Sequence, residues 1–246
     1  MRTKAHPCRL LRRRAWRAAS RCLVAGLLVL SGVSASLADI EVLERERFPF
    51  HDALAGGCLT ADTGPSTKPG TFDLVPGTYG AAVAAPRVIT YRVAVEQGLP
   101  VDAPCFAELV DHILAHANGW TRTERFAFRR VAADEPASAV ITLAAPGTVD
   151  RRCHPLRTNG FFSCWNGARA MINFRQWSGK GRFRGADLRL YRAYLINHEM
   201  GHRLGFVHRR CPRRGQLAPV MMQQTKGVGS CRLNAWPTAD ELPGDS

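Results

Sequence analysis

The chain has 246 residues and a net charge of +14, from 34 basic and 20 acidic residues. Eight of the basic residues and none of the acidic ones lie in the first 38 positions, so the remainder carries a net charge of only +6. This modest excess argues against a nucleic-acid-binding protein. It suits association with the anionic surface of a cell envelope.

The first 38 residues are typical of a secretory signal peptide. Basic residues crowd positions 1–21, a short apolar core runs from Cys22 to Leu30, and Ser36 and Ala38 are small residues that suit cleavage. The apolar core is short for a membrane-spanning helix. We therefore predict a secreted, extracellular protein. The alternative is an uncleaved signal that anchors the chain in a membrane.

Residues 39–86 are predicted to be an N-terminal extension or linker, because Gly, Pro, Thr and Ala are dense in its second half. A single folded domain is predicted for residues 87–246, which are numerous enough to bury one core. Hydrophobic periodicity in the first half of this domain predicts three strands and one helix. The strands span residues 88–95, 125–131 and 139–144, and the helix spans residues 103–118.

The second half of the domain is predicted to contain a loop after residue 144, a hairpin and a long helix. Asn166-Gly167 is a strong signal for a two-residue turn, which would join strands 161–165 and 168–174. A glycine- and arginine-rich loop follows at 178–185. The helix spans residues 187–204, with Asp187 as its N-cap. One stripe of this helix faces the core and a cleft; it consists of Tyr191, Leu195, His198 and His202.

This long helix ends in the strongest motif of the chain, H-E-x-x-H-x-x-G-x-x-H, from His198 to His208. His198 and His202 are four residues apart, so both rings can point at one metal ion from the same helix face. Gly205 can adopt a left-handed backbone, end the helix and return the chain, so that His208 becomes a third ligand. Three protein ligands leave a fourth position open for water, which is typical of catalytic zinc.

The motif also predicts a mechanism. Zinc lowers the pKa of a bound water to roughly 7. Glu199 lies beside the metal, where it can accept the proton of that water and later donate it to the leaving amine. The alternative is a chance match of H-E-x-x-H on an ordinary helix. The added glycine and the third histidine make the zinc interpretation much the stronger of the two.

A second segment supports the zinc site. The run A-P-V-M-M-Q-Q-T, residues 218–225, resembles the methionine turn that lies beneath the metal in the metzincin clan of zinc metallopeptidases. Residues 87–237 also resemble a family of secreted proteins of unassigned function from high-GC bacteria that carry the same zinc signature. The motifs that carry this resemblance are HEMGHRLGFVH, APVMMQQT and CHPLRTNGFFSCWNGARAMINF.

The resemblance implies an α+β, metzincin-like fold with a twisted mixed sheet, two long helices and a small C-terminal part holding the methionine turn. It assigns His198, His202 and His208 as Zn²⁺ ligands, Glu199 as the base and Met221 as the turn methionine, with Met222 as the fallback. Residues 161–165 would be an antiparallel edge strand that can pair with an extended peptide substrate. No tyrosine follows Met221, so the resemblance leaves the oxyanion stabiliser undefined.

Six cysteines lie beyond the signal, and an even number in an exported chain predicts disulfide bonds. Many pairings are compatible with the sequence. We favour Cys58–Cys105, Cys153–Cys164 and Cys211–Cys231, the last of which would close a loop around the methionine turn. No pair has the C-x-x-C spacing of a zinc site. A second possibility is that residues 39–86 form a pro-segment in which Cys58 caps the zinc as a thiolate.

Other candidate residues have simpler interpretations. His112 and His116 are four residues apart on a helix, but surface histidines are favoured over a second metal site. His154 is interpreted as structural. The arginines that follow His208 are interpreted as a solvated basic loop rather than a site for acidic substrate side chains; they are Arg209, Arg210, Arg213 and Arg214. Among the tryptophans, Trp165 has a case for contacting substrate because it lies on the predicted edge strand.

Two functions are compatible with these patterns. The first is a secreted zinc metalloendopeptidase that acts on a peptide or protein substrate. The second is a non-catalytic, zinc-stabilised extracellular module that binds peptides or proteins. The intact Glu199 favours the enzyme, because a purely structural zinc site needs no base at that position.

Overall fold

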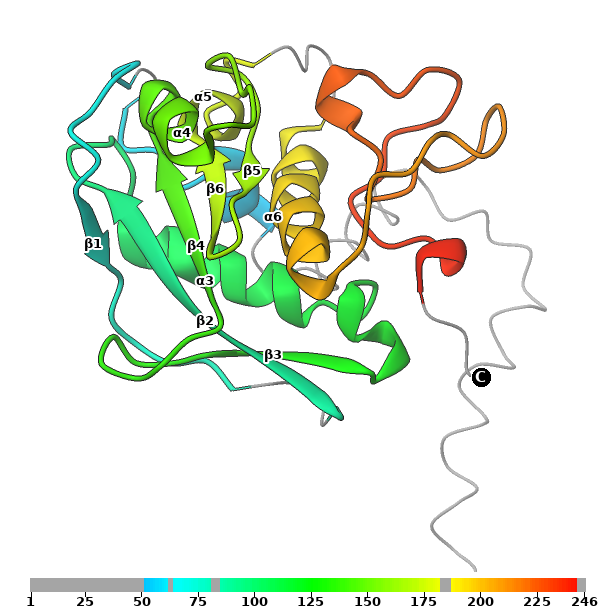
Figure 1. Ribbon diagram of the computed structural model, residues 1–246, viewed down its shortest axis with the longest axis horizontal. Helices are drawn as coiled ribbons and strands as arrows, with labels where there is room; N and C mark the ends of the chain where they lie inside the picture. Colours follow the sequence, from blue (N-terminus) through cyan, green and yellow to red (C-terminus); the bar gives the residue numbers. More distant parts are fainter. Residues whose placement is uncertain (1–50, 62–63, 81–84, 182–186, 243–246) are drawn as a thin grey trace, which may run out of the picture. The chain divides into compact units, whose positions relative to one another are not determined.

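The computed structural model describes residues 51–61, 64–80, 85–181 and 187–242 (Figure 1). The predicted signal peptide and residues 39–50 lie outside this part of the chain. No helix within the described residues combines the length and the apolar character needed to cross a membrane.

The core of the fold is a six-stranded mixed sheet with the order β1-β2-β4-β6-β5, and β3 pairs with β2 beside β1. Strands β2, β3, β4 and β6 run parallel, whereas β1 and β5 are antiparallel to their neighbours. The strands span Phe72–Leu74 (β1), Arg87–Glu96 (β2), Phe126–Arg130 (β3), Ala139–Ala144 (β4), Cys164–Trp165 (β5) and Arg169–Asn173 (β6).

Within the described residues, five α-helices accompany the sheet. They span His51–Gly56 (α2), Ala103–Ala115 (α3), Pro146–Cys153 (α4), Phe174–Trp177 (α5) and Leu188–Leu204 (α6). Single turns of 3-10 helix follow at Trp120–Thr123, Gln224–Lys226 and Ala239–Glu241. The described residues therefore form an α+β fold with a mixed sheet and two long helices, as the sequence predicts.

The two faces of the sheet are covered differently. On the inner face, Ile89, Tyr91 and Val93 are at most 1% exposed, and the Tyr91 hydroxyl donates to Asp111 of α3 at 2.7 Å. Helices α3 and α6 lie on this face (Figure 1). On the outer face, α4 packs over Ala144 and Met171. Side chains alternate between the two faces along each strand, so the period of two in the sequence separates them.

Most predicted elements are confirmed, and three differ. Helix α3 ends three residues earlier than expected, because His116 already has an extended backbone. Residues 146–153, predicted as loop, form α4; Pro146 stands at the first helical position, where its missing N–H does no harm. The hairpin is confirmed, but β5 begins only at Cys164, because the N–H groups of Phe161 and Phe162 bind the Thr158 carbonyl in a turn.

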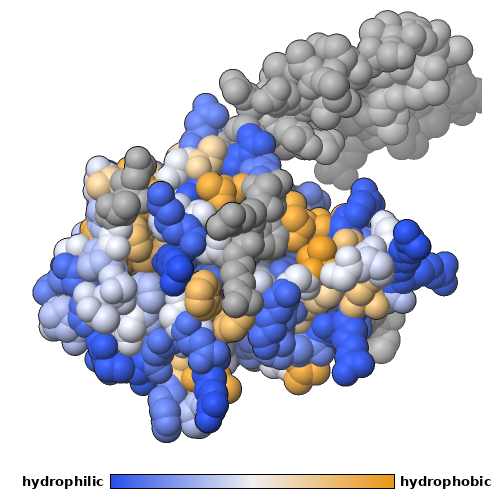
Figure 2. All heavy atoms as spheres, turned by 90° about the horizontal axis from the view of Figure 1, so that it is seen from above, coloured by the Kyte–Doolittle hydropathy of each residue, from blue (hydrophilic) through white to orange (hydrophobic). Residues whose placement is uncertain are grey.

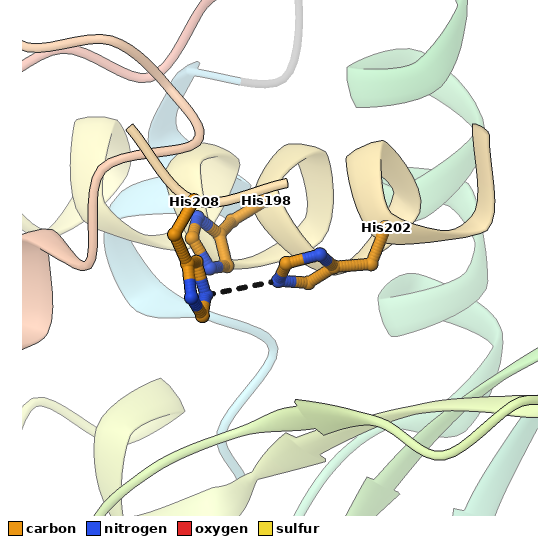
Figure 3. A group of neighbouring side chains, drawn as sticks. All are labelled: His198, His202 and His208. Atoms are coloured by element: carbon orange, nitrogen blue, oxygen red, sulfur yellow. Dashed lines mark hydrogen bonds between the residues drawn. The ribbon is translucent and has the colours of Figure 1, made fainter. Parts of the chain in front are cut away.

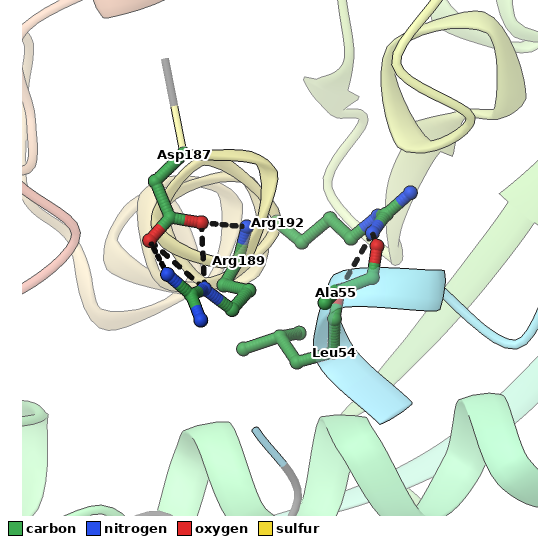
Figure 4. A network of polar contacts seen from close by, with 5 residues as sticks. All are labelled: Leu54, Ala55, Asp187, Arg189 and Arg192. Atoms are coloured by element: carbon green, nitrogen blue, oxygen red, sulfur yellow. Dashed lines mark hydrogen bonds and ion pairs between the residues drawn. The ribbon is translucent and has the colours of Figure 1, made fainter. Parts of the chain in front are cut away.

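Residues 51–61 and 64–79, which the sequence places outside the domain, pack against it. Leu54 of α2 is 3% exposed, and β1 pairs with β2. The buried Arg192 of α6 donates to the carbonyls of Leu54 and Ala55, which fastens α2 to α6 (Figure 4). Removing this segment as a pro-segment would therefore expose part of the core.

Three disulfides join Cys58 to Cys105, Cys153 to Cys164 and Cys211 to Cys231, which confirms the favoured pairing. Such bonds form in oxidising surroundings, so they indicate an extracellular or otherwise oxidising environment. Because Cys58 is in a disulfide, it does not act as a thiolate cap on a metal.

The face of the molecule seen in Figure 2 is mostly hydrophilic, with smaller hydrophobic patches.

Candidate metal centre

Helix α6 positions two of the three motif histidines. Its first turn is capped by the Asp187 carboxylate, which accepts from the Arg189 N–H at 2.9 Å. Its last turn ends at Gly205, whose φ of 102° lies in the left-handed region that glycine adopts without strain. The chain then turns back and brings His208 opposite His198 and His202 (Figure 3). Both predicted end signals of this helix are confirmed.

The three histidines converge on one point. One ring nitrogen from each of His198, His202 and His208 lies within 4.8 Å of the others, and these residues form the metal-compatible cluster found within the described part of the chain. The Nε2 atoms of His202 and His208 are 3.1 Å apart (Figure 3). Nitrogens of three ligands around one zinc lie at similar separations, since each Zn–N bond is about 2.0–2.1 Å long.

Backbone carbonyls fix the orientation of two rings. Nδ1 of His198 is 2.7 Å from the Val220 carbonyl oxygen, and Nδ1 of His202 is 3.0 Å from that of Phe206. A carbonyl only accepts, so each Nδ1 must carry the proton. The lone pair of each imidazole is therefore on Nε2, which is the arrangement that a metal-binding histidine requires.

The charge state of the rings also suits a metal. Burial lowers the pKa of His198 to about 3, and it is the main cause that lowers the pKa values of His202 and His208. The rings are then neutral at physiological pH, as ligands must be. Three neutral imidazoles, each with a ring nitrogen directed to the same point, could hold one metal ion.

Glu199 points into the same space. Its side chain is 4% exposed, and burial raises the pKa of its carboxyl to about 8, partly offset by a backbone hydrogen bond from Trp165. Trp165 belongs to β5, the last strand at this end of the sheet. The Glu199 carboxyl and the edge strand β5 therefore both lie beside the histidine cluster.

A cavity of 620 Å³ surrounds this cluster and Glu199. Its walls come from α6, from the loop before β5, from β5 itself, from the segment 205–208 and from the end of the methionine turn with Lys226. Arg157 and Lys226 are its cationic lining residues, and Leu156 and Val207 are exposed apolar ones. The four arginines after His208 do not line it; all are exposed.

The methionine turn lies directly against α6. An added Cβ at Gly201 would come within 2.3 Å of the Met221 sulfur and 2.8 Å of Trp120 Cζ2. Met221 is fully buried, whereas Met222 is partly exposed. The backbone carbonyl of Met222 accepts a hydrogen bond from the Tyr194 hydroxyl. Met221, rather than Met222, is therefore the methionine that packs against α6.

Glu241 is a residue of this region that the sequence did not single out. Its carboxylate accepts from the N–H groups of Val220 and Met221 at 2.8 and 2.7 Å, and it is 1% exposed. The Val220 carbonyl in turn accepts a hydrogen bond from Nδ1 of His198. Glu241 thus positions His198 through the backbone of the turn. A lone glutamate near the C-terminus offers no local pattern that would reveal this role.

The three other histidines singled out in the sequence, His112, His116 and His154, lie outside the cluster. His112 contacts the ring of Tyr79, and His116 stacks on Trp236 at 4.1 Å between ring centroids. His154 is exposed at the end of α4 and does not line the cavity. The structure does not bring these three into a second metal-compatible group within the described residues.

Comparison with known proteins gives one family. Neither the curated proteins nor the solved structures include a match to this chain. The family DUF3152, described as a protein of unknown function, matches residues 60–243. That span starts well before residue 87, in agreement with the packing of β1 on the sheet. The match covers the sheet, the three-histidine cluster and the methionine turn, and the chain is thus a member of the DUF3152 family.

Proposed function

We propose that the chain is an exported zinc metallopeptidase. The observation that carries this proposal is the convergence of three neutral imidazoles and the Glu199 carboxyl in one cavity. His198, His202 and His208 would hold the zinc, and an all-imidazole set with an open fourth position suits that ion. When bound, the zinc would act as a Lewis acid toward water and the substrate carbonyl.

Glu199 would carry the proton transfers. Its carboxylate would accept a proton from the attacking water and pass it to the leaving amine when the peptide bond breaks. Burial supports this role, because a carboxylate with a raised pKa is a stronger base than an exposed one. The hydrogen bond from the Trp165 backbone would hold the carboxylate in place between the cluster and β5.

The substrate class that we infer is a peptide in an extended conformation. β5 is an antiparallel edge strand whose neighbour in the sheet is β6, and Trp165 on it lines the cavity. An edge strand can bind an extended peptide through main-chain hydrogen bonds. Val207 is 75% exposed and Leu156 is 55% exposed at the same cavity, which favours apolar substrate side chains there.

Cleavage of a diverse peptide library by the exported protein tests the proposal. We expect the wild type to cut peptides and Glu199→Gln to lose at least 1,000-fold in rate, about 4 kcal/mol of transition-state stabilisation. Zinc content is measured on both proteins, and Glu135→Gln, an exposed carboxylate that does not line the cavity, is the matched control.

Two results would decide against the proposal. A Glu199→Gln variant as active as the wild type would show that the mechanism is wrong. A wild type that holds one zinc, cuts no peptide and still binds some of them would favour the non-catalytic, zinc-stabilised binding module instead.

A further inference from the structure

The outer face of the sheet carries two arginines in one row. Arg92 of β2 is the register partner of Val140 in β4, and Val140 is in turn the partner of Arg169 in β6. Register partners in adjacent strands project from the same face, and neighbouring strands are about 4.8 Å apart. The two arginines therefore start roughly 10 Å apart on one surface.

Helix α4 brings a third arginine to this surface. The guanidinium carbons of Arg152 and Arg169 lie 5.7 and 5.4 Å from the ring centroid of Phe72, so both cations contact the same ring. The pKa of Arg169 is lowered, first by burial and then by the charges of Arg152 and Arg92. Arg169 is thus close enough to both Arg92 and Arg152 for their charges to act on it.

Neutral oxygens hold these three side chains. Arg92 Nη1 donates to the Ala133 carbonyl at 2.7 Å, Arg169 Nη1 to the Thr142 hydroxyl at 3.0 Å, and Arg152 Nη2 to the Gly70 carbonyl at 3.3 Å. The ion pairs seen among the described residues involve Arg129, Arg130 and Arg189 instead. The three guanidinium groups are therefore fixed in place without a carboxylate partner in the described chain.

Such an arrangement is unfavourable for folding alone. Arginine does not lose its proton in proteins, and partial burial of Arg92 and Arg169 strengthens their repulsion. The Arg92 Nε is also buried without a hydrogen-bond partner. Groups that are fixed at a loss of stability cluster at functional sites. A guanidinium group forms paired hydrogen bonds with phosphate oxygens.

We propose that Arg92, Arg152 and Arg169 form a binding site for a phosphate group. The site is on the outer face of the sheet, whereas the histidine cluster adjoins the inner face, so it does not depend on the proposed peptidase activity. The phosphate belongs either to a small soluble ester or to the headgroup of an anionic lipid, and both present the same chemistry to the three arginines.

Titration of the full chain with glycerol phosphate tests the site, with binding followed by calorimetry and by the melting temperature. We expect Arg169→Gln to weaken binding at least tenfold and, without ligand, to melt at a higher temperature than the wild type, because repulsion is relieved. Arg129→Gln is the matched control. It lies on the same sheet but its charge is paired with Glu135, so it should bind as the wild type does.

A second arm identifies the source of the phosphate. Vesicles of phosphatidylcholine with and without phosphatidylglycerol are mixed with the wild type and Arg169→Gln at physiological salt. Binding to the anionic vesicles alone, lost in Arg169→Gln, assigns the site to a lipid headgroup, and binding of glycerol phosphate alone assigns it to a soluble ester. The proposal is overturned if neither probe binds, if Arg169→Gln binds as the wild type does, or if Arg129→Gln loses as much affinity as Arg169→Gln.

Discussion

The two halves of α6 are held in the fold in different ways. In the first half, Arg192 donates to the carbonyls of Leu54, Ala55 and Trp177, so one charged side chain fastens the helix to α2 and α5. In the second half, Gly201 lets the helix rest on Met221, and His198 bonds to Val220. The contacts of the first half join structural elements, whereas those of the second half fix the position of a histidine of the cluster.

This contrast predicts that the stability of the fold and the affinity for a metal depend on different halves of α6. A change in the first half should lower the free energy of unfolding and leave metal affinity unaltered. A change in the second half should alter metal affinity. The turn that contains Met221 also contains Val220, whose carbonyl accepts a hydrogen bond from His198. The three substitutions below test this separation.

The largest effect is expected for Arg192→Met. The substitution removes a buried cation and leaves three carbonyls without their donor, which should destabilise the fold by about 3 kcal/mol. Chemical denaturation measures the change. Arg189→Met on the same helix is the control; its ion pair with Asp187 is exposed, so the expected loss is below about 0.5 kcal/mol (Figure 4). A variant that stays stable but binds zinc more weakly would contradict the separation.

A smaller effect is expected for Gly201→Ala. The new methyl group would press on the Met221 sulfur and on Trp120, both of which are fully buried, at a cost of about 2 kcal/mol. The turn would shift with Met221, so zinc affinity should fall as well. Gly56→Ala is the control, because an added Cβ there has no neighbour within 4 Å. Wild-type zinc affinity in Gly201→Ala would show that the turn does not position the cluster.

The smallest effect on stability is expected for Glu241→Gln. The amide keeps one acceptor for the two turn N–H groups but loses the charge, so the turn loosens while the fold persists. Residues behind metal ligands typically contribute about 10-fold to 100-fold in affinity, and we expect a loss of about tenfold in zinc affinity. Competition with a chelating dye measures it. An unchanged affinity together with a lower melting temperature would assign Glu241 a structural role only.

The sequence predicted α6 well because its signals are local. Asp187 caps the first turn, Gly205 ends the last one, and the four-residue spacing of His198 and His202 is a property of any helix. The same holds for the strands that alternate between two faces. The hairpin was predicted because Asn166-Gly167 determines its turn.

The contacts that support the site were not predictable from the sequence. Glu241 lies 21 residues from Val220, whose N–H it binds, and Arg192 lies 137 residues from Ala55. Gly201 occupies a variable position of the motif, and only its packing against Met221 shows why a glycine is needed there. These roles depend on how distant segments pack, and a single sequence carries no periodicity for such contacts.

The proposed function depends above all on the binding of one zinc ion by three histidines. X-ray absorption at the zinc edge, combined with metal analysis of the purified chain and of His208→Ala, tests this binding most directly. We predict one zinc per chain with three nitrogen neighbours and one oxygen neighbour at about 2.0–2.1 Å, and a weakly bound, more oxygen-rich zinc in His208→Ala. A wild type without zinc, or one whose zinc environment is unchanged by His208→Ala, would contradict it.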